Sequence, residues 1–153
     1  MPLDPVAVWA EQSIKVWPES YWLLDLAPGD FAGAARALEI STARYACIIR
    51  DQMGFSLVID EATRDTLRDA IAPRQSFGPL KVISTDSPLP FDVVGFIQAA
   101  LREVNGAGFK AAPQCGAAAD HFFTGAQDID AVAKLFDGLI ARAKSTAPAA
   151  APS

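Results

Sequence analysis

The chain has little of what builds metal centres, disulfide frameworks or phosphate loops. Its 153 residues include two cysteines, Cys47 and Cys115, and a single histidine, His121. With no CxxC pair and one histidine, we expect no metal site built from these residues. We expect both thiols to be reduced and packed. The glycines show no Walker or dinucleotide spacing, so no cofactor is expected.

Two further absences concern partners and location. No apolar run approaches the roughly twenty residues that span a bilayer. The N-terminus MPLDPVAVWAEQ lacks the basic start and apolar core of a signal peptide. We therefore expect a cytoplasmic protein with no membrane partner. The net charge is −5, and the thirteen basic residues form no stripe with interleaved aromatics, so nucleic acid is not an expected partner.

What the chain does have is a globular composition and a repeat. Hydrophobic residues make up 51% and charged residues 20% of the sequence, which is ample for a packed core. From residue 21 to 71 the apolar pattern predicts strand, helix, strand, strand, helix, and from 80 to 144 the same order returns. A repeat of about sixty residues with this order predicts an α+β fold of two ferredoxin-like βαββα units in tandem, with antiparallel sheets packed against helices.

The expected elements follow from apolar spacing and turn residues. In the first half they are strands at 14–17, 21–26, 45–50 and 55–60 and helices at 31–38 and 61–71. In the second half they are strands at 80–84, 109–112 and 121–125 and helices over 93–104 and 129–140, the former the longest of the chain. The corresponding organisation is an N-terminal extension over 1–13, units over 14–75 and 76–144, and a disordered Ala/Pro-rich tail over 145–153.

Turn chemistry makes these expectations more specific. The turn Pro18-Glu19-Ser20 predicts a hairpin that pairs the first two strands. A four-residue connection ending in Gly54 predicts a second antiparallel hairpin, with Gly54 free to take positive φ. Residues 1–13 carry Val6, Trp9 and Ala10 at helical spacing, so they could form a short helix whose placement stays open.

Both halves place a proline, a phenylalanine and an aspartate where a strand gives way to a helix. These stretches are Ala27-Pro28-Gly29-Asp30-Phe31 and Leu89-Pro90-Phe91-Asp92. Asp30 and Asp92 are each positioned to cap the helix that follows. Free first-turn amides at such places bind small anions, including the carboxylate of an amino acid. We call these two strand-to-helix connections mouths, and we predict a binding site at one of them.

Several stretches also carry a family resemblance. Ile14–Leu26 looks like an opening hairpin with a proline turn, and Leu89–Ile97 stands where relatives carry L-D-F-S-L-T-G-V-L. Asp120-His121-Phe122-Phe123 stands where they show T-D-Y-L-L-V. Over residues 14 to 140 the chain resembles the tandem ACT-domain proteins of the CASTOR-like type. The resemblance implies two units with paired sheets and a regulatory amino acid bound between them.

The chain departs from that pattern at the residues that would touch the ligand. Pro90 replaces an acid before Phe91, Asp92 replaces a hydroxyl after it, and residues 116–119 replace a polar run with Gly-Ala-Ala-Ala. This chain therefore lacks some of the side chains that the resemblance would place in contact with an amino acid ligand. A pocket with more apolar walls could serve a different ligand or a reaction.

Our candidates for ligand binding lie at or near the predicted mouths. They are Phe91, Asp92, Val93, Asp120, His121 and Asp30. Asp30 and Asp92 could equally serve only as helix caps, and a lone histidine among aromatics could be a packed residue. Asp120 and His121 are adjacent in a predicted strand, so their side chains face opposite ways and cannot form a dyad.

Three functions remain open at this level. The leading one is a non-enzymatic regulatory protein that binds an amino acid or related metabolite at the junction of two ACT-like units. The alternative is a cofactor-free isomerase, cyclase or lyase that uses the same pocket, with Asp92, Asp120 or His121 as acid and base. The third is an interaction protein, because pairing of exposed sheet edges between chains would give a homodimer.

Overall fold

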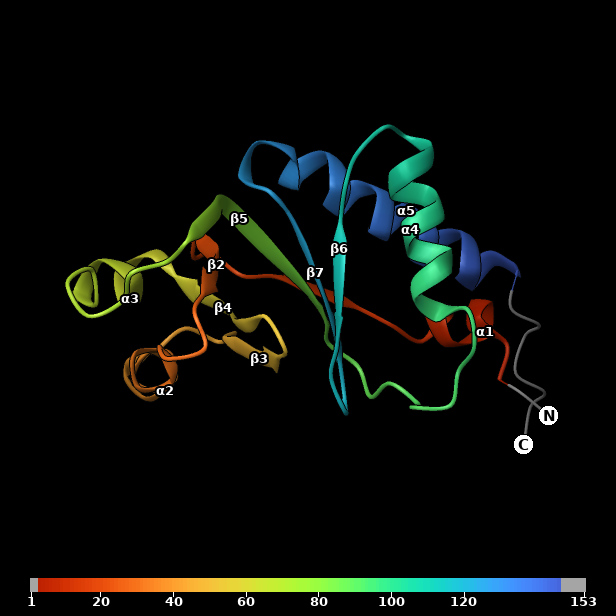
Figure 1. The fold of residues 1–153 in the computed structure, drawn as a ribbon. Coiled ribbons are helices and arrows are strands. Elements are labelled where there is room, and N and C mark those ends of the chain that lie inside the picture. Colours follow the sequence, from red (N-terminus) through yellow and green to blue (C-terminus); the bar gives the residue numbers. More distant parts are fainter. Residues whose placement is uncertain (1–2, 147–153) are drawn as a thin grey trace. The chain divides into compact units, whose positions relative to one another are not determined.

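The structure, a computed structural model, describes residues 3–146, whose course is drawn in Figure 1. These residues divide into two compact units, which we describe separately. The central unit comprises Trp17–Val82, and the terminal unit combines residues 3–16 with residues 83–146. The N-terminal residues that the sequence sets apart as an extension thus belong to the terminal unit. The expected boundary at residues 75 and 76 falls inside a strand, because the sheet continues past Pro73.

The central unit is one repeat of the predicted order. Its elements are β2 (Tyr21–Leu26), α2 (Phe31–Ile40), β3 (Cys47–Asp51), β4 (Gly54–Asp60), α3 (Glu61–Thr66) and the first part of β5 (Gln75–Thr85). The strands pair antiparallel in the order β3, β4, β2, β5. Leucine and isoleucine side chains of β2 and β4 meet Ala34 and Ala37 of α2 in the core, where small residues let the helix approach the sheet.

Two features of this unit bear on the sequence predictions. The hairpin between β3 and β4 is confirmed, and Gly54 takes φ +135° beside the backbone of Leu26. Helix α3 ends at Thr66 rather than at residue 71. Leu67 and Ile71 nevertheless pack in the core from the turn that follows, which is why their spacing resembles that of a longer helix.

The terminal unit contains the second repeat and the N-terminal residues. Its elements are α1 (Pro5–Ala10), β1 (Ile14–Val16), the last part of β5, α4 (Phe96–Gly106), β6 (Ala112–Cys115), β7 (Asp120–Gly125), the 3-10 turn η1 (Ala126–Asp128) and α5 (Ile129–Thr146). Strand β5 has β1 and β7 as neighbours, and β6 pairs antiparallel with β7. Helices α1, α4 and α5 pack against one another, and in Figure 1 α4 crosses in front of α5. The repeated order of elements and the α+β class are as predicted.

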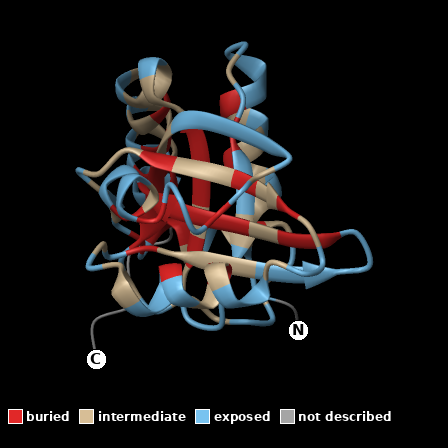
Figure 2. Ribbon diagram, turned by 60° about the vertical axis from the view of Figure 1, so that its left-hand side comes forward, coloured by how far each residue is buried: buried red, intermediate tan, exposed pale blue. Residues whose placement is uncertain are grey.

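The core of the terminal unit is aromatic. Trp9 of α1 is fully buried and stacks on Phe96 with ring centroids 4.1 Å apart. Its indole Nε1 donates a hydrogen bond of 2.9 Å to the carbonyl oxygen of Phe96. Phe136 of α5 meets both Trp9 and Phe122 edge to face. The short N-terminal helix that the sequence suggested is therefore present, and its placement is set by one tryptophan. Figure 2 shows the buried residues in red on the strands, with exposed stretches along the helices.

The predicted hairpin between the first two strands is wrong. β1 pairs with β5, from Ile14 opposite Thr85 to Val16 opposite Ile83. The turn after Trp17 is held differently, because the Lys81 ammonium group binds the carbonyl oxygens of Pro18 and Glu19. A proline turn between two apolar runs does not distinguish a hairpin from a chain that crosses to another partner.

Helix and strand boundaries in the second repeat also differ from the expectation. α4 begins at Phe96 rather than near residue 93 and has 11 residues, whereas α5 has 18 and is the longest helix among residues 3–146. The strand expected at 109–112 is β6 at Ala112–Cys115, because Gly108 at φ +83° ends the preceding turn and Phe109 packs into the core first. Of the tail expected at 145–153, residues 145 and 146 continue α5, and the rest lies outside the described residues.

Both cysteines carry free thiols, as expected, but they are not both packed. Cys47 is half-buried, whereas Cys115 is exposed at the end of β6. The Gly-Ala run that follows Cys115 forms a turn on the surface, so it cannot cover the thiol. In the part of the chain that the structure describes, no helix is both long and apolar enough to cross a membrane.

Candidate functional site

A cavity of about 320 Å³ opens at the start of α4 in the terminal unit. Three pieces of chain line it: the loop before α4, the first turn of α4, and the tip of the β6–β7 hairpin. The lining residues are Leu89, Pro90, Phe91, Val93, Gly95, Phe96, Ile97, Gln98, Cys115, Gly116, Ala117 and Asp120. Every one of them belongs to the terminal unit.

The first turn of α4 gives the cavity an electropositive side. Gly95 precedes the helix at φ +87°, a conformation that side chains rarely adopt, and no side chain from the described residues caps the helix. The first amides of a helix have no intrahelical partner, and the helix dipole adds partial positive charge there. The backbone N–H groups of Phe96, Ile97 and Gln98 therefore have no acceptor within the helix, and all three residues line the cavity. The buried stacking of Trp9 on Phe96 fixes where this turn lies.

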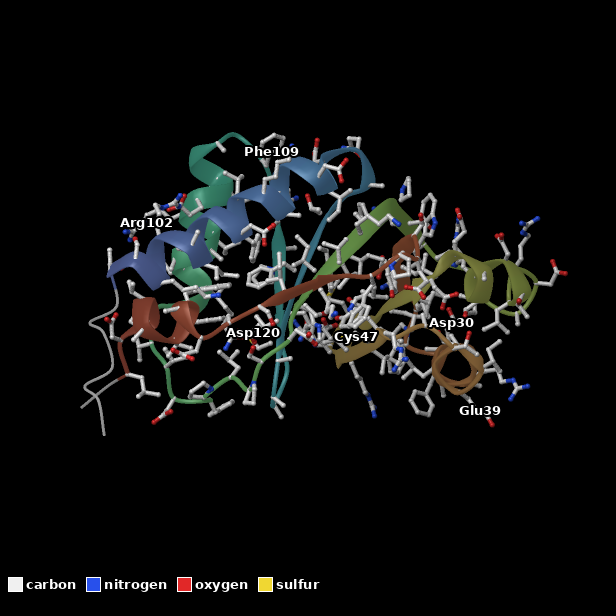
Figure 3. The ribbon with its side chains drawn as sticks, turned by 180° about the vertical axis from the view of Figure 1, so that it is seen from behind. Asp30, Glu39, Cys47, Arg102, Phe109 and Asp120 are labelled. Atoms are coloured by element: carbon white, nitrogen blue, oxygen red, sulfur yellow. The ribbon has the colours of Figure 1, made fainter. Side chains whose placement is uncertain are left out.

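The opposite side is built by the β6–β7 hairpin. Cys115 pairs with Asp120 across the hairpin, and the Gly116 amide donates to the carbonyl oxygen of Ala119 at 3.0 Å. The Asp120 amide donates to Thr85 Oγ1, also at 3.0 Å, which anchors the start of β7 to β5. These bonds hold the Asp120 side chain, labelled in Figure 3, at the cavity.

Asp120 is the electronegative group of the site. Asp120 as a whole residue is only 6% exposed. Burial raises the pKa of the Asp120 carboxyl, while hydrogen bonds from the Gly116 amide and the Cys115 thiol oppose that shift. Desolvation and the Asp120 charge raise the pKa of Cys115 in turn, so this thiol stays protonated and is a poor nucleophile. The cavity thus has a carboxylate on one side and helix amides on another.

Three of the six candidate residues line this cavity, namely Phe91, Val93 and Asp120. Asp92 lies in the same loop but is exposed and does not line the cavity. It does not cap α4 either, because the helix begins four residues later behind Gly95. Asp30 belongs to the central unit and makes no side-chain cap bond to α2, so its predicted capping role is wrong.

His121 faces away from Asp120, as strand alternation predicts. Its Nδ1 lies 2.7 Å from the hydroxyl oxygen of Ser84, and burial lowers the pKa of the imidazole. His121 is not among the residues that line the cavity. Of the three residues named as acid and base, His121 and Asp92 are therefore outside the cavity and Asp120 lines it.

Only three of the twelve lining residues were candidates from the sequence. Ile97 and Gln98 look like ordinary helix residues, and Cys115 and Gly116 look like part of a flexible connection. The available signal was Gly95, because a glycine between an exposed loop and an apolar helical run marks the true helix start.

The corresponding mouth of the central unit has much less free space. Its cavity, lined in part by Pro28 and Phe55, holds only about 90 Å³. The Arg74 guanidinium lies at this mouth, where Nη2 is 2.6 Å from Asp25 Oδ1 and donates to the carbonyl oxygens of Leu26 and Met53 at 3.2 and 2.9 Å. The two mouths that look alike in sequence are therefore not equivalent.

The site offers no metal chemistry of its own. Among residues 3–146, no three histidine, cysteine, aspartate or glutamate side chains come together as metal ligands would. The carboxyl and thiol groups among the described lining residues are those of Asp120 and Cys115, and a hydrogen bond joins them.

Comparisons with known proteins give a likeness in structure alone. No family model matches the sequence, and no curated protein matches it significantly. A protein of unknown function from Vibrio cholerae, described as a possible transport protein, is 12% identical with a TM-score of 0.66, over 88% of this chain and 94% of that one.

Two regulatory domains are also similar. A C-terminal regulatory domain of an aspartate kinase from Porphyromonas gingivalis is 11% identical over 86% of this chain and 98% of its own length, with a TM-score of 0.58. The regulatory subunit of aspartate kinase from Thermus flavus is 10% identical over 84% and 95%, with a TM-score of 0.55. The chain has the α+β fold of these ACT-type regulatory domains, and the likeness does not single out the CASTOR-like type.

Proposed function

We propose that this protein is a regulatory module that binds a small metabolite, an amino acid or a close relative, in the cavity at the start of α4. The observation that carries the proposal is the pairing of opposite charges in one cavity. The uncapped amides of Phe96, Ile97 and Gln98 suit a carboxylate, and the Asp120 carboxylate suits an ammonium group. A free amino acid carries both groups.

Two further observations support this proposal. The fold is shared with domains whose names describe them as regulatory parts of aspartate kinases. The alternative of an enzyme has less support, since Asp120 lines the cavity but no second acid or base from His121 or Asp92 is among the described lining residues. The sequence suggests a site at the junction of two units. We place the ligand inside the terminal unit, because that unit supplies the whole lining.

A homodimer through sheet edges stays a prediction. The outer strands of the two units are β3 and β6. Pro113 in β6 has no backbone N–H to donate, so β3 offers the better edge, with Ile49 exposed on it.

We expect a panel of amino acids and related metabolites to raise the melting temperature saturably for at least one member. A ligand at a hundred times its Kd stabilises the folded state by about 2.7 kcal/mol, which differential scanning fluorimetry detects easily. Asp120→Asn should abolish the shift. Asp137→Asn, which changes an exposed aspartate on α5, should leave it intact. A full panel without a shift, or an equal shift in both variants, contradicts the proposal.

Binding should weaken as the pH falls. The ammonium group of the ligand pairs with ionised Asp120, whose pKa burial raises above its usual value of 3.8. Affinity should therefore fall by about tenfold per pH unit below that raised pKa. Calorimetric titrations at several mildly acidic pH values test this, and Asp120→Asn should bind weakly with no such slope. A wild-type affinity that rises on acidification would show that Asp120 is not the partner.

The folding stability of the ligand-free protein should depend on pH in the opposite direction. A carboxyl with a raised pKa binds its proton more readily in the folded state than in the unfolded state. Its contribution to stability is present at low pH and is lost as the pH rises through the raised pKa. A fall in pH should therefore weaken ligand binding but increase the contribution of Asp120 to folding stability. Measurements of affinity and of stability against pH can thus distinguish the two effects.

A further inference from the structure

The residues that form the walls of the cavity indicate which side chain the ligand carries, which the two groups that bind its charged ends do not. The following inference rests on the proposed function and concerns the part of the ligand between and beyond those ends. The side-chain walls are mainly apolar, and they are made by Leu89, Pro90, Phe91, Val93, Phe96 and Ile97. An apolar wall binds an apolar group through the water that both surfaces release.

The charges around the cavity argue against an ionic ligand side chain. The described lining residues include no lysine, arginine or histidine, and Asp120 is their sole ionisable carboxyl. A second carboxylate on the ligand would lose its hydration without gaining a cation, and it would be repelled by Asp120. A ligand ammonium or guanidinium side chain would likewise be desolvated, because Asp120 is already paired with the α-ammonium group.

Exposure of one aromatic residue points the same way. Phe91 lines the cavity and is 89% exposed, and Val94 in the same loop is 72% exposed. Exposed apolar side chains that gather in one place, as these do beside the cavity, are a feature of binding surfaces. An apolar ligand group seated in the cavity would cover part of the Phe91 ring.

The size of the cavity limits the ligand to one small molecule. A volume of about 320 Å³ lies at the lower end of the range of about 300 to 1,000 Å³ for small-molecule pockets. That volume suits a single amino acid with a medium-sized side chain and is small for a nucleotide or a peptide.

We propose that the cavity selects α-amino acids with an apolar side chain, of leucine, isoleucine, valine or phenylalanine chemistry, and rejects those with ionic side chains. Asp120 holds the α-ammonium group, and the first-turn amides of α4 hold the α-carboxylate. Val93 and Ile97 contact the apolar side chain. Phe91 closes over it from the loop.

The test compares four ligands on the unaltered protein by isothermal titration calorimetry. They are leucine, its deaminated analogue 4-methylpentanoate, its decarboxylated analogue 3-methylbutylamine, and aspartate. We expect leucine to bind, each analogue that lacks one charged end to bind at least about tenfold more weakly, and aspartate to bind about a hundredfold more weakly. Valine, isoleucine and phenylalanine complete the apolar set and lysine completes the ionic set.

Variants locate the binding site. Ile97→Ala removes part of the apolar wall and should weaken leucine binding by about tenfold or more. Because 3-methylbutylamine and 4-methylpentanoate carry the same apolar group, the ratio of their two affinities should change little. Leu38→Ala, which changes an exposed leucine on α2 of the central unit, is the matched control and should bind leucine as the parent does. Far-ultraviolet circular dichroism confirms that each variant is folded.

The outcomes separate this inference from the proposed function. Aspartate or lysine binding as tightly as leucine overturns the apolar selectivity and leaves a metabolite-binding module in place. Leucine binding that survives Asp120→Asn and Ile97→Ala overturns the assignment to this cavity. No binding by any amino acid overturns both. Because the ligand series uses the unaltered chain, the selectivity is tested even where a variant is unstable.

Discussion

Replacing Trp9 by alanine should lower the free energy of unfolding by roughly 3–5 kcal/mol. The indole is fully buried, stacks on Phe96 and meets the edge of Phe136 with ring centroids 5.8 Å apart. The substitution leaves a cavity in the aromatic core and removes the 2.9 Å hydrogen bond to the Phe96 carbonyl oxygen. Such a loss is a large part of the 5–15 kcal/mol by which domains are usually stable. Urea denaturation monitored by circular dichroism measures it.

A control on the same helix separates packing from helix propensity. Val6→Ala changes an exposed residue of α1 and should alter stability by less than about 0.5 kcal/mol. Trp9→Phe keeps a ring but loses the indole donor, so its effect should lie between the two. If Trp9→Ala were as mild as Val6→Ala, α1 would not be part of the terminal unit. Ligand affinity should also fall in Trp9→Ala, because Phe96 begins the turn whose amides line the cavity.

Gly54→Ala should destabilise the central unit by roughly 2–4 kcal/mol, for a reason that involves no lost contact. Gly54 takes φ +135°, where residues with a side chain are strained. An added Cβ would also collide with the carbonyl oxygen of Leu26 and approach Pro28 N at 3.2 Å. Backbone must therefore shift at the start of β4, which is paired with both β2 and β3.

The matched control is a glycine in the neighbouring turn. Gly29→Ala adds a Cβ with no heavy atom within 4 Å and no positive φ, so its effect should stay within about 0.5 kcal/mol. Thermal and chemical unfolding of both variants side by side tests the difference. Equal losses from the two substitutions would contradict the backbone argument.

Helix α4 shows how much of the fold could be predicted from the sequence. Apolar spacing from Val93 onward predicts a helix, and Asp92 is a favourable cap, so local propensity places the start there. The structure instead starts the helix at Phe96, because Gly95 adopts a left-handed conformation that the chain uses to turn into the helix. Periodicity reports which residues face the core, and Val93 does pack there from the loop. It does not report which backbone conformation brings them there.

The partner of β1 shows a second limit. Ile14 and Val16 have strand propensity, and a proline turn separates them from β2, so the local pattern favours a hairpin. Pairing with β5 depends on residues about seventy positions away, which local spacing cannot contain. The same holds for the site. The loop with Phe91 and Val93 was predictable, whereas its closeness to Cys115 and Asp120 follows from hairpin packing across the fold.

The guanidinium of Arg74 at the mouth of the central unit also limits stoichiometry. A tandem repeat with two open mouths could take two ligands per chain and respond to them sigmoidally. Here the cavity at one of those places holds only about 90 Å³, and beside it Arg74 is bonded to Asp25 and to the carbonyl oxygens of Leu26 and Met53. A single chain would then follow a hyperbolic saturation curve with one molecule bound, and any steeper response would have to come from association of chains.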